Sequence, residues 1–166
     1  DLNKAERIDP SAKGLPAAKG MAYATRAAAR AEVHDIHGAE TDLKEADTLG
    51  TPPRWLSKAT RALAGAYKRR GDEFLKNGDP NGALQDFEAA DTLHTPSLIS
   101  VFDRAKAFRE RAKIQEKDGT LEGTLADYES AAKHDPRQPM LTERADLQVK
   151  LGEEALANQD FHKASE

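Results

Sequence analysis

Apolar residues recur every three or four positions along this chain, which is the spacing of one face of an α-helix. The clearest stripe consists of Trp55, Ala59, Leu63, Tyr67, Gly71 and Phe74. A second stripe follows it and consists of Ala83, Leu84, Phe87, Ala90 and Leu93. Only a short polar turn around Gly78 and Asp79 separates the two stripes. Because so short a turn places two helices antiparallel, the pattern predicts a helical hairpin.

Polar breaks divide the rest of the chain in the same way. An acid or a threonine followed by proline, as at Thr51-Pro52 and Asp79-Pro80, is typical of a helix start. Asn77-Gly78, Asp118-Gly119 and Asn158-Gln159 are predicted to be the turns inside hairpins. We therefore expect helices over residues 17–34, 36–49, 53–77, 80–94, 97–117, 121–134, 139–157 and from 160 onward.

One phrase occurs twice. The sequence EADTLGTP at residues 45–52 returns as AADTLHTP at residues 89–96, which is 44 residues later. Self-similarity at such a period is typical of stacked repeat proteins. The phrase lies where one hairpin ends and the next begins, so we expect it to be a seam and not a binding element.

The best single repeat contains Tyr67, Arg70-Gly71, Phe74, Gly78, Ala83, Phe87, Ala90 and Pro96. It resembles the tetratricopeptide repeat, a helix–turn–helix motif built from small and aromatic residues. Only Arg70 departs clearly from that motif, and the proline lies one position late. Weaker copies stand in register on either side, with equivalent small residues at Ala46, Ala90 and Ala131. The spacing of 44 and 41 residues is longer than the usual 34 of that family.

The resemblance implies an all-α fold, a right-handed solenoid of antiparallel helical hairpins in one array over residues 1–166. Its expected units are the end of a preceding repeat, three full repeats and the start of a fourth, over 1–13, 14–52, 53–96, 97–137 and 138–166. The first residue is Asp1 and not methionine. We therefore expect a processed form or a fragment of a longer protein.

Composition narrows the function classes. The 166 residues include 33% charged side chains and carry a net charge of −4, which argues against nucleic acid and anionic lipid as partners. With no cysteine, disulfide scaffolds and thiolate metal sites are excluded. No apolar run is long enough to predict membrane insertion. A soluble protein is expected, with the cytoplasm favoured over the periplasm or secretion.

The first helices of stacked hairpins normally line the concave face of a repeat array, so their residues outside the apolar stripe are the predicted contact surface. The predicted partner-binding residues are Met21, Lys68, Asp72, Leu75, Lys76, Lys106, Arg109 and Lys113. Beside Met21, the small residues Ala24, Ala28 and Ala31 give the first unit a smooth apolar face. Such a groove suits an extended peptide with an acidic part. The alternative is a solvated helix face with ordinary ion pairs.

Other kinds of site find less support. Some tetratricopeptide proteins clamp a C-terminal carboxylate with an asparagine after the glycine, but Ala28, Asp72 and Lys113 occupy that position here. His34-Asp35-x-His37 places two imidazoles near each other, yet no third metal ligand is fixed by the sequence. There is no phosphate-binding loop and no nucleophile elbow. We therefore expect no metal, no cofactor and no enzymatic activity.

The sequence thus predicts a non-catalytic protein–protein interaction module that holds a peptide or a helix of a protein partner. Two alternatives remain open. The array could be a structural spacer or a self-assembling scaffold, with self-association through the terminal half-units. It could also be an accessory domain of an enzyme whose catalytic part lies outside this chain.

Overall fold

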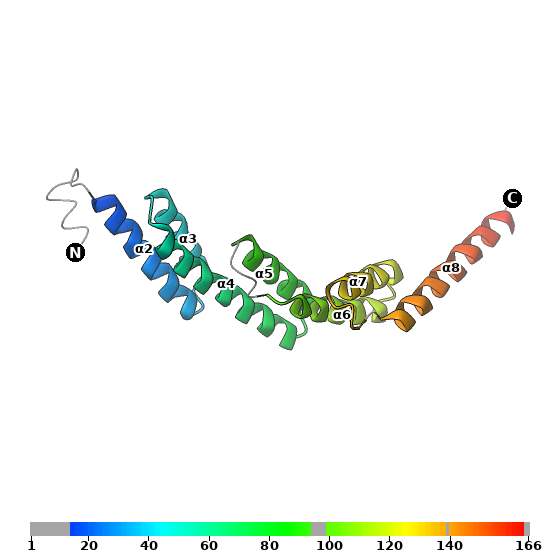
Figure 1. The fold of residues 1–166 in the computed structure, drawn as a ribbon. Coiled ribbons are helices and arrows are strands. Elements are labelled where there is room, and N and C mark those ends of the chain that lie inside the picture. The colour runs from blue at the N-terminus through cyan, green and yellow to red at the C-terminus, as the bar shows by residue number, and fades with distance from the viewer. Residues whose placement is uncertain (1–13, 94–98, 139, 165–166) are drawn as a thin grey trace. The chain divides into compact units, whose positions relative to one another are not determined.

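A computed structural model describes residues 14–93, 99–138 and 140–164, with side chains described as far as residue 155. Every regular element in these ranges is an α-helix, and no strand occurs in them (Figure 1). The predicted all-α fold is therefore confirmed. The predicted close of a preceding repeat, within residues 1–13, lies outside the described residues.

The helices follow the predicted order closely. They are α2 (Leu15–Glu32), α3 (Ile36–Thr48), α4 (Pro53–Lys76), α5 (Pro80–Thr92), α6 (Val101–Lys117), α7 (Leu121–His134) and α8 (Leu141–Ala164). Thr51-Pro52 directly precedes α4, and Pro80 of Asp79-Pro80 is the first residue of α5, as the proline pattern predicts. Ser100 begins α6 with a capping box, in which its hydroxyl accepts from the backbone N–H of Asp103 while the Asp103 carboxylate accepts from the Ser100 backbone N–H.

One predicted boundary is wrong. A turn was expected at Asn158-Gln159, with separate helices on either side, but α8 continues through this pair without a break. The other two predicted turns do form, and they contain Gly78 and Gly119, whose φ angles are +79° and +77°. Asn158-Gln159 offers no glycine for that left-handed conformation, and neither residue interrupts a helix as proline does.

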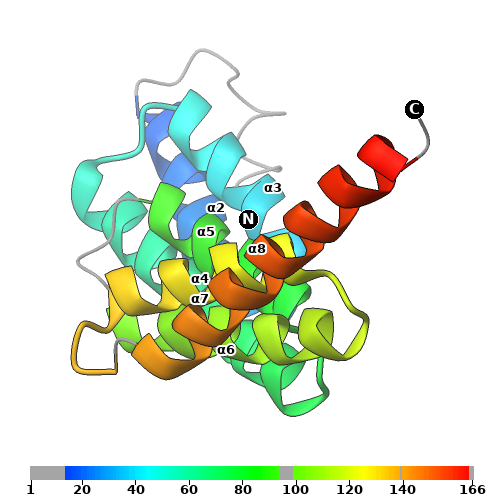
Figure 2. The same cartoon turned by 90° about the vertical axis from the view of Figure 1, so that its right-hand side faces the viewer.

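The chain divides into two compact units. The first comprises Asp1–Gly71 with Asp86–Leu98, and the second comprises Asp72–Gln85 with Ile99–Glu166. In the first unit α2 and α3 pack side by side as an antiparallel hairpin. In the second unit α6 and α7 do the same, and α8 packs against α7 (Figures 1 and 2).

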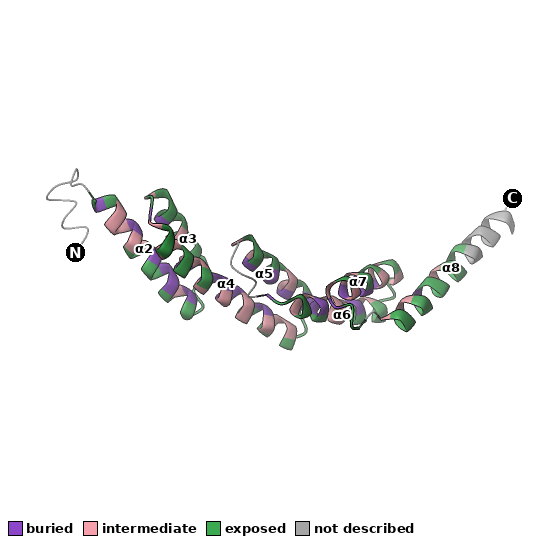
Figure 3. Cartoon of the chain, in the orientation of Figure 1, coloured by how far each residue is buried: buried purple, intermediate pink, exposed green. Residues whose placement is uncertain are grey.

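Small residues dominate the core of each unit. Buried positions form a stripe along each hairpin helix and face its neighbour (Figure 3). In the first unit a cluster of five buried alanines is covered by larger apolar side chains that include Trp55, Leu56 and Leu43. In the second unit Ala112, Tyr128 and Leu147 form the buried cluster. Alanines allow the helix axes to approach closely, and the few large side chains fill the gaps that remain.

Gly71 shows how tight this packing is. A Cβ atom placed on Gly71 would lie 2.5 Å from Cε1 of Phe87, which is fully buried. The Phe87 ring therefore occupies the space that any larger residue at position 71 would need. Gly71 on α4 and Phe87 on α5 therefore bring the two helices of this hairpin close together.

The repeated phrase closes its two helices in the same manner. The hydroxyl of Thr48 donates to the carbonyl of Glu45 at 2.9 Å, and that of Thr92 donates to the carbonyl of Ala89 at 2.7 Å. Carbonyls near the end of a helix have few partners within it, and each hydroxyl donates to one of them. The Glu45 carbonyl also accepts from the backbone N–H of Leu49 at 3.2 Å. In the first copy Thr51 also donates to the carbonyl of Ala46 from a buried position. The phrase thus ends helices, as expected of a seam.

An arginine–aspartate pair, less visible in the sequence than the repeated phrase, recurs in each hairpin and joins its two helices. In all three hairpins an arginine on the first helix binds an aspartate 16 residues later through two hydrogen bonds of 2.6–2.7 Å, from Nε and Nη2 to the two carboxylate oxygens. We call these pairs the arginine–aspartate clamps. They are Arg26–Asp42, Arg70–Asp86 and Arg111–Asp127.

Each clamp has the same surroundings. The arginine lies over an aromatic ring three residues earlier, on Tyr23, Tyr67 or Phe108, with the guanidinium carbon 5.1–5.5 Å from the ring centre. The three aspartate side chains are at most 5% exposed, whereas the arginines are 29–54% exposed. Hydrogen bonding to the aspartate, only partly offset by burial, raises the pKa of each arginine. The fork geometry of arginine therefore keeps a buried carboxylate paired.

We expect Arg70→Ala to lower the free energy of unfolding by about 2 kcal/mol, because Asp86 would stay buried without its charged partner. The double variant Arg70→Ala/Asp86→Ala should lose less than the two single variants combined. Urea unfolding followed by circular dichroism measures both. Glu73→Ala, an exposed change on the same helix, is the matched control. Additive losses, or a loss no larger than that of the control, would contradict the role of the clamp.

Candidate functional site

An open groove of about 530 Å³ lies between α2 and α4 in the first unit. We call it the α2–α4 groove. Its lining residues are Thr25, Ala28, Ala29 and Glu32 on α2, and Lys58, Arg61, Ala62, Gly65 and Arg69 on α4. Both helices are the first helices of their hairpins, the class of helix that the sequence predicts to bear the contact surface.

Small side chains form the floor of the groove and charged ones form its rim. Ala28, Ala62 and Gly65 are buried or half-buried, so the two helix backbones approach the surface between them. Lys58 and Arg61 are exposed on the rim. Such a floor admits the backbone of another chain, because no large side chain blocks its approach.

Arg69 is held at one end of the groove by contacts with the first hairpin. Its Nη2 donates to the carbonyl of Ala31 at 3.0 Å, in the last turn of α2, and its Nε donates to Nε2 of His34 at 3.2 Å. Glu32 approaches the same guanidinium at 3.9 Å. Arg69 therefore satisfies a helix-end carbonyl of α2 while its side chain lines the groove.

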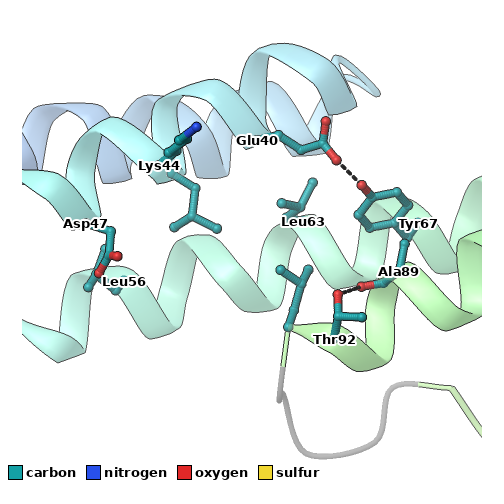
Figure 4. A pocket seen from close by; sticks show the side chains of 10 residues that line it. Glu40, Lys44, Asp47, Leu56, Leu63, Tyr67, Ala89 and Thr92 are labelled. Carbon is teal, nitrogen blue, oxygen red and sulfur yellow. Dashed lines mark hydrogen bonds between the residues drawn. The ribbon is translucent and has the colours of Figure 1, made fainter.

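A second cavity, of about 360 Å³, lies on the face of α4 that is opposite the α2–α4 groove (Figure 4). We call it the leucine pocket. Its residues are Glu40, Leu43, Lys44 and Asp47 on α3, Leu56, Leu63 and Tyr67 on α4, and Ala89, Thr92 and Leu93 at the end of α5 and just after it. Apolar walls dominate it, and charged groups occur only on the side of α3.

Tyr67 closes one end of the leucine pocket. Its hydroxyl donates a hydrogen bond to the carboxylate of Glu40 (Figure 4). Burial, and then the hydrogen bond and charge of Glu40, raise the pKa of the Tyr67 phenol well above its ordinary value of 10.0. The hydroxyl therefore stays protonated, and this contact joins α3 to α4 within the first unit.

The chain was compared with family models, with curated proteins and with solved structures. No match was found. Within the described ranges, no helix is both long enough and apolar enough to cross a membrane. The function must therefore be inferred from the residues of the chain itself.

The structure distributes the predicted partner-binding residues over both units. Met21 and Lys68 are half-buried on α2 and α4, and Asp72, Leu75 and Lys76 follow on the last turns of α4. None of these described residues lines the α2–α4 groove. Of the small residues expected to make a smooth contact face, Ala28 lines the groove. The expectation is wrong for Ala24 and Ala31, which are at most 1% exposed and belong to the hairpin core.

On α6 the predicted residues lie on the surface of the hairpin. Lys106 and Lys113 are exposed, and Lys113 donates to Glu110 at 2.9 Å. Arg109 is half-buried, and its Nη1 is shielded from solvent with no hydrogen-bond partner in the described part of the chain. The Lys113–Glu110 pair is the kind of contact that the alternative of a solvated, ion-paired face predicts.

Sequence reasoning missed the rim residues Lys58, Arg61 and Arg69. The signal was present, because positions 58, 61, 65 and 69 repeat every three or four residues on the face of α4 opposite the apolar stripe. It was overlooked because the sequence does not reveal which polar positions of α4 lie next to α2.

Of the segment His34-Asp35-x-His37, the first two residues shape the turn between α2 and α3. The carboxylate of Asp35 accepts from the backbone N–H of Gly38 at 2.9 Å and so caps α3. His37 is 95% exposed, and His34 takes the positive φ of 65° that closes the turn. Among the described residues, no group of three or more potential ligands could hold a metal ion.

In the second unit, His134 at the end of α7 stacks on the clamp aromatic Phe108. The ring centres are 5.7 Å apart and the rings are 9° from parallel. Burial, and then the positive charges of Arg104 and Lys133, lower the pKa of His134 below its ordinary value of 6.5. The folded protein therefore favours a neutral imidazole at this position.

This lowered pKa predicts a pH dependence of stability. Above pH 6.5, His134 is neutral in both the folded and the unfolded chain and contributes nothing. As the pH falls below 6.5, the unfolded chain takes up a proton more readily, so the free energy of unfolding should decrease. His134→Phe should reduce this loss in urea unfolding compared between about pH 7.5 and about pH 5. His37→Phe, at an exposed site, should retain the full loss of stability at low pH. An unchanged pH profile for His134→Phe would contradict the role of His134 in this loss.

Proposed function

We propose that this chain is a non-catalytic protein-interaction module that holds a segment of a protein partner in the α2–α4 groove. The observation that carries the proposal is an open groove between two helices, with an alanine and glycine floor and long polar side chains on its rim. A peptide backbone can lie close to such a floor, and the rim side chains can reach the groups that it carries.

The contents of the groove favour binding over catalysis. Among the described residues that line it, Thr25 alone has a hydroxyl, and that hydroxyl donates to the carbonyl of Met21 at 2.8 Å. The carboxylate among the described lining residues is that of Glu32, which lies seven residues after Thr25 on α2, about 10 Å along the helix axis, and is therefore too far away to act as its base. A nucleophile and a base within hydrogen-bond reach are the minimum for covalent catalysis, and the groove does not bring such a pair together.

Filling the groove should abolish binding. A displayed library of random peptides, selected on the full chain, should yield peptides whose affinity falls at least about tenfold on Ala29→Trp. Ala29 is exposed, so the indole should enter the groove without disturbing the core. Glu45→Trp, at an exposed position of α3 outside both cavities, should bind as the wild type does.

Circular dichroism would show that all three proteins are equally folded. The proposal is wrong if the selected peptides bind Ala29→Trp as tightly as the wild type, or if the selection enriches no peptide.

One observation favours self-assembly as a second function. Along α8, the positions Leu141, Ala145, Val149 and Gly152 repeat every three or four residues and are all exposed. Leu141 is 67% exposed and Val149 is 59% exposed. The other face of α8 packs on α7 through Leu147. An exposed apolar stripe on a helix that already has one packed face is suited to a second copy of the chain.

If this stripe mediates self-association, the mean mass in analytical ultracentrifugation should rise with protein concentration. Val149→Asp should return the chain to the monomer, because it places a charge in the apolar contact. Lys150→Gln lowers the net charge by the same amount at a neighbouring exposed position on another face of α8, and should leave association unchanged. A wild-type chain that is monomeric at all concentrations would exclude this function.

A further inference from the structure

The charge of the α2–α4 groove is opposite to that of the chain. Lys58, Arg61 and Arg69 place three positive charges on the lining, against the single negative charge of Glu32. The whole chain carries a net charge of −4. A basic groove on an acidic protein raises the local concentration of anionic segments and disfavours basic ones.

From this we infer that the partner segment is acidic and extended, with two carboxylates four residues apart and a small residue midway between them. The inference rests on the proposed function and specifies the partner of the same groove. Its basis is the spacing of the cations along α4 and the size of the residues between them.

The spacing follows from helix and strand geometry. Arg61 and Arg69 are eight residues apart on one helix, which corresponds to about 12 Å along its axis. An extended chain rises about 3.3 Å per residue, so four residues span about 13 Å. Side chains at alternate positions of an extended chain point to the same side. The first and fifth residues of the segment can therefore meet the two ends of the rim, while the third faces the floor.

Each end of the rim offers a different anion site. Lys58 lies one helical turn before Arg61, so a carboxylate at this end can lie between two cations. At the other end, Nε and Nη2 of Arg69 are bonded to the first hairpin. The remaining Nη1 lies 3.5 Å from the position that a Cβ would take on Gly65, which places it over the floor. The second carboxylate would bind there, in competition with Glu32.

The floor selects against bulky or aromatic ligands. Between the two ends lie Ala28, Ala29, Ala62 and Gly65, none of which offers a ring on which a nucleobase could stack. A small side chain at the middle position lets the peptide backbone descend to this floor. An acidic peptide therefore fits the groove better than a single-stranded nucleic acid does.

Amide chemical-shift titrations of the isotope-labelled full chain can test the inference. The probe is a glycine- and serine-flanked peptide with two aspartates four residues apart and alanines between them. We expect it to shift the amides of Ala28, Ala29 and Gly65, and to bind about tenfold more tightly than its bis-asparagine analogue. An isomer with adjacent aspartates should bind more weakly, and added salt should weaken the binding of the probe.

Substitutions on the rim should change the affinity for the peptide in opposite directions, depending on the charge that they remove. Lys58→Gln and Arg61→Gln should each weaken binding about 3- to 10-fold, whereas Glu32→Gln should strengthen it about 2- to 5-fold by removing the competing carboxylate. Lys44→Gln removes an exposed lysine of α3 at the leucine pocket, which lies on the other side of α4 from the groove, and should have no effect on binding.

Four outcomes would overturn the inference. They are equal affinity for the bis-asparagine analogue, equal affinity for the isomer, an equal effect of Lys44→Gln, or tighter binding of an oligothymidylate than of the peptide. Failure of the proposed function would look different, because no peptide selected from the library would then be lost on Ala29→Trp. If the selected peptides are neutral and their binding is still lost on Ala29→Trp, the proposed function holds but the preference for an acidic segment is wrong.

Discussion

The hairpins of this protein depend on keeping a buried aspartate paired with an arginine. Each of Asp42, Asp86 and Asp127 is removed from water by the packing of two alanine-rich helices, and an unpaired carboxylate there would cost about 2 kcal/mol, a large fraction of the stability of a typical domain. Because both hydrogen bonds of the fork must form together, the clamp fixes the register of the second helix against the first. Apolar packing between alanines leaves that register less well defined, since neighbouring small residues are nearly interchangeable.

The positions of the helices could be predicted from the sequence, because periodicity, proline and glycine act within a few residues of one another. Asn158-Gln159 is the instructive exception, since a polar pair without glycine does not end a helix. Arg70 shows a different limit. Judged against a familiar repeat motif it looked like a departure, yet it is the member of the clamp that recurs at Arg26 and Arg111. The arginine recurs when the sequences of the three hairpins are aligned with one another and not with an outside motif.

The candidate groove was harder to foresee than the fold. That first helices bear a contact surface could be expected from the hairpin pattern, but which of their polar residues face a neighbouring helix depends on how α2 and α4 pack. Ala24 and Ala31 illustrate the difficulty, because an alanine suits a groove floor and a helix interface equally well. Lys58 and Arg61 became candidates only once their place beside α2 was known, and the local reversal of charge there does not show in the overall composition.

The polar contacts of the hairpins fall into two classes, those within one hairpin and those between successive hairpins. The clamps lie within hairpins and recur at intervals of 44 and 41 residues, so a duplication or deletion of one such interval leaves no carboxylate stranded. The bond from Arg69 to Ala31 and the bond from Tyr67 to Glu40 join successive hairpins and involve residues particular to that junction. A change in the number of hairpins would thus keep each clamp intact, whereas a change in their order would break the contacts that shape the groove.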